Sequence, residues 1–314
     1  MGFEDALSSG RQGSRYHDIF HLSNPIISTM PPSADIVRDL HKYEYTILYA
    51  IERLMKRYRW VPFDDLKRIT RLSKNELEYR LGELMEKDLI SYNAVPYPGY
   101  GLVFAGYDCL ALHTLAGRKT ISALGSLIGV GKESEVYEAL GLGVIVLKFH
   151  RVGQHSFQSV RLKRDYMTDN SHCPWIFAST LSAEQEYEAL LRLTGKVRVP
   201  VPIDRSRNTI AISYIPGVNL NQCTLADPRP VYEELISEMQ KTYSMGIIHA
   251  DFSEYNVMVN EDHCWIIDWP QWVECSHPNA DELLRRDVET IVTFFNRKYR
   301  MGINPDDALS AITG

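Results

Sequence analysis

The sequence lacks several features that mark particular classes of protein. Its 314 residues carry 34 Lys and Arg against 40 Asp and Glu, a formal charge of −6, which excludes a uniformly basic nucleic-acid coat. The five cysteines are spread out with no CxxC pair, so we expect reduced thiols rather than a disulfide framework or zinc site. His263, Cys264, Cys275 and His277 resemble a ligand set, but residues 265–269 between them read as a buried strand, which favours a structural role.

Long hydrophobic runs are also absent. The longest stretch without a charged residue in the first half is Leu89–Tyr107, and its two prolines, three glycines and Asn93 argue against a membrane span. Residues 1–29 lack the apolar core of a signal peptide. We interpret residues 1–33 as a loose N-terminal extension, with Met30 as an alternative start. The length predicts about two domains, and 45% apolar residues can fill their cores.

Residues 34–118 are predicted to form one small unit, called here the winged-helix module. Apolar residues recur at helical spacing over Ile47–Tyr58, a short helix is expected over Pro62–Ile69, and a third can begin after the capping residue Ser73. Gly, Pro and Tyr residues over Ala94–Tyr107 then indicate a two-stranded hairpin. Three helices followed by a hairpin is the order of a winged helix-turn-helix.

The winged-helix module has almost no net charge, because residues 34–90 hold 12 basic and 11 acidic side chains. Its basic residues nevertheless form two local clusters. These are Arg53, Lys56, Arg57 and Arg59, and then Lys67, Arg68, Arg71 and Lys74. Such a cluster can hold nucleic-acid phosphates, or it can be a solvated helix face. Both interpretations stay open, as does a role in protein binding.

From about Leu115 the pattern changes to short extended runs separated by glycine. Strands are predicted over Ile121–Leu127, Ser134–Leu140, Gly143–His150, Val199–Asp204 and Thr209–Tyr214. Helices are predicted from about Ser182 and over Pro230–Met245 and Asn279–Tyr299. The polar segment Arg151–Ser171 has no periodicity and is predicted to be a long loop.

The sequence Gly129-Val130-Gly131-Lys132-Glu133-Ser134, called here the glycine loop, lies between two predicted strands. Glycine lets backbone amides approach a phosphate closely. The sequence is not a Walker loop, because Glu133 follows Lys132 and Ser126 stands at the leading glycine position. A dinucleotide fingerprint fits poorly, because a strand follows the turn where a helix should begin. Strand, loop and strand together indicate the nucleotide clamp of protein kinases.

A kinase-like clamp requires a lysine on the next strand, and Lys148 supplies it. A lysine flanked by Leu147 and Phe149 is costly to bury without a carboxylate partner. The helix from Ser182 offers Glu186 as the preferred partner and Glu184 as the reserve.

Two further motifs complete a phosphoryl-transfer set. Asp251 is followed five residues later by Asn256, and Asp268 ends an apolar strand. Phosphoryl transfer needs a carboxylate near the attacking oxygen and oxygen ligands for a magnesium ion on the phosphates. Taken singly these are ordinary turn residues, but their order after the glycine loop and Lys148 favours an ATP site.

The motifs Gly-Lys-Glu-Ser-Glu-Val-Tyr, His-Ala-Asp-Phe-Ser-Glu-Tyr-Asn and Ile-Asp-Trp-Pro-Gln resemble the RIO family of atypical Ser/Thr protein kinases. The winged-helix module narrows the resemblance to the second RIO type, and the short C-terminus to its archaeal form. The resemblance covers roughly residues 34–300. It implies an α+β fold in which a winged helix-turn-helix precedes a compact bilobal kinase-like domain over residues 119–314. The N-lobe would span about 119–212, the hinge 213–216 and the C-lobe 217–314.

The resemblance also implies roles for individual residues. The residues expected to contact ATP are Gly131, Lys132, Ser134, Val136, Lys148, Glu186, Ser213, Ile215 and Asn256. Lys148 would hold the triphosphate, and the backbone of Ser213 and Ile215 would bind adenine. Asp251 and Asp268 would be catalytic, with Asn256 and Asp268 as ligands for Mg²⁺ or Mn²⁺. Ser156 and Ser159 are weaker candidates for phosphorylation.

Family members are ATP-dependent factors that mature the small ribosomal subunit. The implied partners are therefore ATP and the pre-ribosomal small subunit, bound through the winged helix, in the cytoplasm and away from membranes. Only 46 residues follow Asp268, which leaves little platform for a peptide substrate. We therefore give the hydrolysis of ATP, coupled to a conformational change, at least the same weight as the transfer of phosphate to a protein. In that version Asp251 or Asp268 receives the phosphoryl group, or Asp251 positions water.

Two other classes of function stay open. One is a nucleic-acid-binding regulator whose kinase-like half is a passive nucleotide sensor, although such a sensor would be expected to have lost a catalytic group. The other is a small-molecule phosphotransferase, which usually carries a larger helical lobe than the residues after Asp268 can form.

Overall fold

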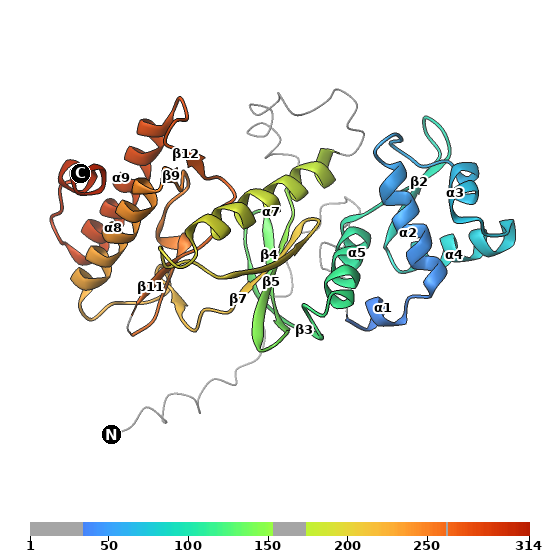
Figure 1. The fold of residues 1–314 in the computed structure, drawn as a ribbon, viewed down its shortest axis with the longest axis horizontal. Coiled ribbons are helices and arrows are strands. Elements are labelled where there is room, and N and C mark those ends of the chain that lie inside the picture. Colours follow the sequence, from blue (N-terminus) through green and yellow to red (C-terminus); the bar gives the residue numbers. More distant parts are fainter. Residues whose placement is uncertain (1–33, 153–173, 262) are drawn as a thin grey trace, which may run out of the picture.

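The computed structural model describes residues 34–152, 174–261 and 263–314. Figure 1 shows three parts along the molecule: the winged-helix elements, a central sheet with a helix on either side, and a largely helical part at the C-terminus. The winged-helix module contains α1 (Ala34–Asp39), α2 (Lys42–Leu54), α3 (Phe63–Thr70), α4 (Lys74–Glu86), β1 (Ile90–Asn93), β2 (Gly99–Leu102) and α5 (Phe104–Gly117). The three predicted helices correspond to α2, α3 and α4, and the predicted hairpin corresponds to β1 and β2. The predicted boundaries between the domains stay a prediction.

Local capping explains where two of the module's helices, α2 and α4, begin. The Ser73 hydroxyl accepts a hydrogen bond from the Glu76 amide at 3.3 Å, which confirms the predicted cap of α4. A capping box that we did not predict starts α2, where His41 accepts from the Tyr43 amide and Glu44 accepts from the His41 amide. Helix α3 ends at Thr70, and its C-cap residue Arg71 has a left-handed φ of 58°.

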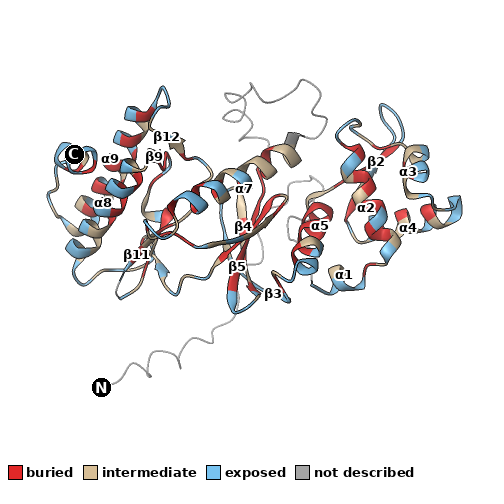
Figure 2. Cartoon of the chain, viewed as in Figure 1, coloured by how far each residue is buried: buried red, intermediate tan, exposed pale blue. Residues whose placement is uncertain are grey.

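Helix α5 was not predicted, and the hairpin expected to reach Tyr107 ends at Leu102 instead. The helix is buried over most of its length, as Figure 2 shows, so it has no polar face from which to read a helical period. It also begins with an unusually close approach. A Cβ added at Gly106 would lie 2.0 Å from the Leu89 carbonyl oxygen, so only glycine fits there.

Five antiparallel strands form the central sheet in the order β3-β4-β5-β7-β6. They are β3 (Ala123–Val130), β4 (Ser134–Leu140), β5 (Val144–His150), β6 (Pro202–Ser206) and β7 (Thr209–Ser213). One face packs against α5 through a cluster that includes Leu112, Leu115 and Phe149. Helix α7 (Pro174–Leu193) crosses the other face and begins at Pro174 rather than at Ser182 as predicted. The early turns escaped prediction because Trp175 and Ile176 pack against the winged-helix core.

The C-terminal part holds the remaining elements. They are β8 (Val218–Asn219), α8 (Pro228–Ser244), β9 (Ile247–Ile248), a 3₁₀ turn (Glu254–Asn256), β10 (Val257–Val259), β11 (Cys264–Ile266), β12 (Val273–Glu274), α9 (Ala280–Tyr299) and α10 (Pro305–Thr313). Helix α10 was missed although Asn304 caps it and proline opens it, which is a recognisable start signal. Within the described ranges, no helix is both long and apolar enough to cross a bilayer.

Candidate active site

Lys148 lies at the centre of the candidate site. It projects from β5 toward α7, where its Nζ atom is 2.8 Å from Glu186 Oε1 and 2.7 Å from Oε2. The same Nζ donates to Asp268 Oδ1 at 2.7 Å. Glu186 was the predicted partner and is confirmed. The reserve, Glu184, instead pairs with Arg205 at the surface.

Burial and charge set the electrostatics of this group. Burial would lower the pKa of Lys148, but the carboxylates of Asp268 and Glu186 outweigh it and raise the pKa. Burial would likewise raise the pKa of Glu186, but the Lys148 cation and the His150 ring lower it to about 2. His150 Nε2 lies 3.0 Å from Glu186 Oε2. Both shifts favour the charged forms, so Lys148 and Glu186 are a charged pair at neutral pH.

The loop that carries Asp251 and Asn256 lies next to Asp268. The Asn256 side-chain amide donates to the Asp251 carbonyl oxygen at 2.8 Å. The Ile267 amide donates to the Asn256 carbonyl oxygen at 2.9 Å, in line with the antiparallel pair of β10 and β11. Lys148, Asp251, Asn256 and Asp268 thus meet at one place although they are far apart in sequence.

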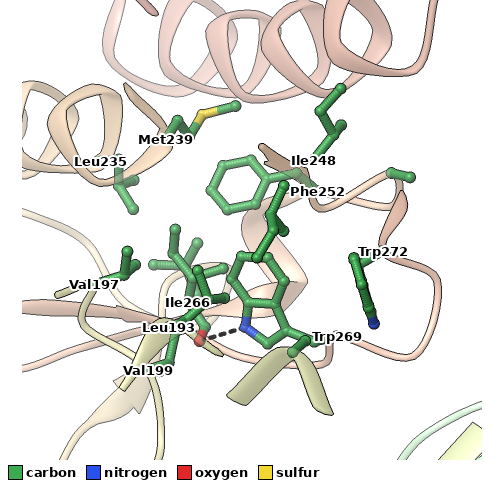
Figure 3. Close-up of a cluster of buried hydrophobic side chains, with 14 of the residues drawn as sticks. Leu193, Val197, Val199, Leu235, Met239, Ile248, Phe252, Ile266, Trp269 and Trp272 are labelled. Carbon is green, nitrogen blue, oxygen red and sulfur yellow. Dashed lines mark hydrogen bonds between the residues drawn. The ribbon is translucent and has the colours of Figure 1, made fainter. Parts of the chain in front are cut away.

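Buried aromatic residues anchor the two loops that carry Asp251 and Asp268. Phe252 follows Asp251 and Trp269 follows Asp268, and both rings are buried in the C-terminal core drawn in Figure 3. The Trp269 indole donates to the Ile266 carbonyl oxygen at 3.1 Å. Each carboxylate therefore stands one residue before a fixed side chain, which restricts its position.

Asp287 on α9 holds the Asp251 loop, and sequence reasoning missed it. Its two oxygens accept from the Ala250 amide at 2.7 Å and from the Phe252 amide at 2.9 Å. The loop needs this support because Ala250 has a left-handed φ of 63°. A signal was present: Asp287 occupies a buried position in the apolar stripe of α9, where a carboxylate needs partners.

The glycine loop is linked to the same carboxylates by charge. The Gly131 amide donates to the Ser134 carbonyl oxygen at 2.8 Å. Burial raises the pKa of Glu133; Lys132 opposes the shift, whereas Asp268 and Asp251 add to it, so the loop lies within electrostatic reach of both aspartates.

Two predicted ATP contacts stand apart from this group. Ser213 ends β7, where its amide donates to the Val201 carbonyl oxygen and its hydroxyl accepts from the Val201 amide, both at 2.9 Å. Among the described residues, no hydrogen bond or ion pair joins Ser213 or Ile215 to the Lys148 group. By contrast Val136 pairs directly with Lys148 between β4 and β5, so both side chains share one face of the sheet.

The predicted metal ligands have suitable free atoms. The Asn256 amide nitrogen donates to the Asp251 carbonyl oxygen, and Asp268 Oδ1 accepts from Lys148. Among the described residues, the other oxygen of each side chain, Asn256 Oδ1 and Asp268 Oδ2, accepts no hydrogen bond. Within those same residues, no group of three or more His, Cys, Asp and Glu side chains could hold a metal, and His263, Cys264, Cys275 and His277 are no exception. Mg²⁺ commonly uses one or two protein oxygens together with phosphate oxygens and water, so these two residues fit it.

Asp251 can act on a proton or a phosphoryl group. Burial raises the pKa of its carboxyl group; His249 opposes the shift, and nearby Asp268 adds to it. A carboxylate with a raised pKa is a stronger base. The role assigned to each site residue stays a prediction, and Ser156 and Ser159 lie outside the described residues.

Comparison with protein families agrees with this geometry. The family described as "Rio2, N-terminal" matches residues 37–118, and the family described as "RIO domain" matches residues 135–308, more than half of the chain. The chain belongs to the RIO family. The match to the N-terminal family places it with the Rio2 type, whose fold is a winged helix followed by a RIO kinase domain.

Individual relatives show how far the likeness extends. The serine/threonine-protein kinase rio2 of Dictyostelium discoideum is 36% identical over 84% of this chain, which spans about half, 51%, of that relative. The RIO-type serine/threonine-protein kinase Rio2 of Methanocaldococcus jannaschii is 33% identical over 79% of this chain and 93% of its own length. A crystal structure described as the Rio2 kinase–ADP/Mg²⁺–phosphoaspartate complex from Chaetomium thermophilum matches with a TM-score of 0.76, 33% identity and 88% coverage of both chains.

Proposed function

We propose that the chain is an ATP- and magnesium-dependent atypical Ser/Thr kinase that also hydrolyses ATP. The observation that carries the proposal is the position of Lys148 Nζ, within 2.8 Å of both Glu186 and Asp268. A buried lysine held between a fixed carboxylate and a metal-binding carboxylate is the arrangement that phosphoryl transfer uses. Membership in the RIO family and the ADP/Mg²⁺ complex of the related kinase add support.

Each group has a role in this proposal. Lys148 and the amides of the glycine loop hold the phosphates, and Asp251 accepts the proton of the attacking hydroxyl or water. Asn256 and Asp268 hold Mg²⁺, which when bound supplies positive charge to the phosphate oxygens. Ala250 stands where ordinary kinases carry the arginine that clasps a phosphorylated activation loop, so this position supplies no such clasp.

Hydrolysis can proceed through a phosphoaspartate, which the related crystal structure contains. A carboxylate oxygen of Asp251 or Asp268 forms a bond to the γ-phosphorus while the bond to the bridging oxygen breaks, and ADP leaves with that electron pair. Water then attacks the phosphorus, the acyl phosphate bond breaks, and inorganic phosphate and the free carboxylate result. In this route Asp251 and Asp268 are the two possible acceptors.

The decisive experiment measures turnover and labelling together. Purified wild type, Asp251→Asn and Asp268→Asn are incubated with γ-labelled ATP and Mg²⁺. We expect slow turnover by wild type, loss of turnover in one or both variants, and ATP binding that persists in Asp251→Asn. A protein label released by hydroxylamine identifies an acyl phosphate, and its absence from one variant identifies the acceptor. Equal, negligible turnover in all three proteins would favour a passive nucleotide sensor.

The proposal also includes a cytoplasmic role on the precursor of the small ribosomal subunit, docked through the winged-helix module. Arg53, Lys56, Arg57 and Arg59 are all exposed, so they are free to contact phosphates. Changing these four residues to Glu should weaken binding to small-subunit RNA and reduce its salt dependence. Unchanged binding and salt dependence would mean that the cluster is only a solvated surface.

A further inference from the structure

Besides the more exposed pair of Arg118 with Asp204 on β6, two ion pairs in which the sheet side supplies the arginine join the winged-helix module to the central sheet. Arg207, in the turn between β6 and β7, lies 2.6 Å and 2.9 Å from the two carboxylate oxygens of Glu52 on α2. Arg151, just after β5, donates from Nη2 to Asp108 Oδ2 on α5 at 2.7 Å. The two pairs differ in burial, because the Asp108 side chain is fully buried whereas that of Glu52 keeps 24% of its exposure.

The two pairs also differ in what lies beyond them. Arg151 Nη2 is 3.2 Å from Glu135, the second residue of β4, and the Arg151 amide donates to the Glu133 carbonyl oxygen at 2.7 Å. One residue therefore holds α5 with its side chain and the glycine loop with its backbone. Among the described residues, Arg207 hydrogen-bonds to α2, α5 and Ser206 and not to the glycine loop.

The bond to Glu133 fixes the direction of an amide in the glycine loop. In a trans peptide the carbonyl group and the next N–H point in opposite directions. With its carbonyl on Arg151, the Glu133–Ser134 peptide turns the Ser134 N–H away from β5 and toward the loop. Ser134 is one of the residues expected to contact phosphate, so Arg151 sets part of the phosphate-binding geometry.

Asp108 reaches the Lys148 group by a second route. Its Oδ1 accepts from Asn208 Nδ2 at 2.7 Å, and the same nitrogen donates to the His150 carbonyl oxygen at 3.1 Å. The His150 amide donates to the Asn208 carbonyl oxygen at 2.8 Å. Because side chains alternate along β5, His150 points to the opposite face from Arg151, where its ring lies 3.0 Å from Glu186.

We propose that Asp108 is a positioning residue for the phosphate-binding loop, through which the winged-helix module controls nucleotide binding. Asp108 touches no solvent and has both oxygens engaged, so it acts through Arg151 and Asn208 rather than on a ligand. The inference rests on the proposed ATP-binding function. Because coupling between binding events is reciprocal, nucleotide binding also tightens the docking of α5.

The test compares Asp108→Asn with Glu52→Gln, which removes the charge from the other ion pair and leaves the glycine loop untouched. Binding of ATP, ADP and adenosine is measured by calorimetry for each protein, after thermal unfolding has shown that it is folded. We expect Asp108→Asn to weaken ATP and ADP binding about tenfold, equal to about 1.4 kcal/mol, and to leave adenosine unchanged. Glu52→Gln should bind all three ligands as wild type does.

Three results would overturn the inference: unchanged ATP binding in Asp108→Asn, an equal loss of ATP and adenosine, or the same ATP-selective loss in Glu52→Gln. If Asp108→Asn does not fold, Arg151→Lys replaces it, because lysine keeps the charge but cannot span both Asp108 and Glu135. The ATP-selective loss, smaller in size, is then expected, and its absence overturns the inference. A wild type that binds no ATP refutes the proposed function instead.

Discussion

Two buried cations lie three residues apart at the end of β5, and each sits between two carboxylates. Lys148 contacts Glu186 and Asp268, and Arg151 contacts Asp108 and Glu135. The first group is open on one side, because the Asp268 side chain keeps 40% of its exposure, whereas the carboxylates of the second keep 0% and 11%. The comparison shows that the same arrangement of charges can have two roles. An open group can exchange a carboxylate for a ligand, whereas a closed group holds the structure in place.

Removing a carboxylate from the closed group around Arg151 should cause the largest loss of stability. In Asp108→Ala the Arg151 guanidinium stays buried and keeps Glu135 as its remaining carboxylate among the described residues, and breaking a buried pair in this way costs about 3–5 kcal/mol of unfolding free energy. The matched change in the open group, Asp268→Ala, should cost about 1 kcal/mol or less, because that carboxylate is partly solvated. Urea unfolding of both variants measures the difference. Equal costs would mean that the two cations are not distinct in kind.

Activity should show the opposite ranking. Lys148→Met removes the cation that faces the phosphates, and we expect ATP turnover to fall about 100-fold, the loss typical of a preorganised charge contact. Arg151 contacts no phosphate in our proposal, so Arg151→Lys should keep most of the turnover at saturating ATP. Steady-state phosphate release measures both. Turnover in Lys148→Met within twofold of wild type would refute the assignment of the site.

The open group around Lys148 could be predicted from the sequence, and the closed group around Arg151 could not. Lys148 lies in an apolar strand, so its side chain was expected to be buried and to need a carboxylate partner. The helical spacing of α7 then favoured Glu186 as that partner. Asp108 stands immediately after the longest uncharged stretch of the first half, inside a helix that is buried on nearly all sides. Such a helix shows no polar period, and the partner of Asp108 lies 43 residues away on another unit.

Other features divide along the same physical line. Motifs with local rules were predicted, such as the Ser73 cap and the strand over Ser134–Leu140, which the structure reproduces as β4. Features that depend on tertiary contact were missed, such as Asp287, which serves the Asp251 loop from a distant helix. Residue types and spacing thus identified the reacting groups, whereas the groups that hold them in place depended on the fold.

The pH dependence of stability separates the two cations further. Burial raises the pKa of Asp108 to about 6, against the opposing effect of Arg151, from an ordinary value of 3.8. Between those values the folded protein binds more protons than the unfolded chain, so this residue's contribution to stability falls as pH rises from about 4 to about 6. The fall is on the order of 2–3 kcal/mol.

The measurement is the difference in unfolding free energy between wild type and Asp108→Asn across that pH window, since asparagine cannot titrate. The pKa of Glu186 is lowered from 4.5 to about 2, so the open group adds a slope of the opposite sign up to about pH 5, and this slope cancels in the difference because both proteins carry Glu186. A flat difference, or one that grows with pH, would contradict the expected environment of Asp108.

The smallest expected effect comes from two glutamates on α7 that lie two residues apart. Residues at that spacing do not share a helix face, so Glu186 faces Lys148 whereas Glu184 pairs with Arg205 at the surface at 2.9 Å. Because the Glu184 side chain keeps 53% of its exposure, Glu184→Gln should change the unfolding free energy by about 0.5 kcal/mol or less and leave ATP turnover unchanged. Glu186→Gln, an equally conservative change, should lower both, since it leaves Lys148 buried with Asp268 alone. Urea unfolding and phosphate release on the two variants measure this contrast. If they behaved alike, general damage to α7 would explain the loss, and the Lys148–Glu186 pair would have no special part in it.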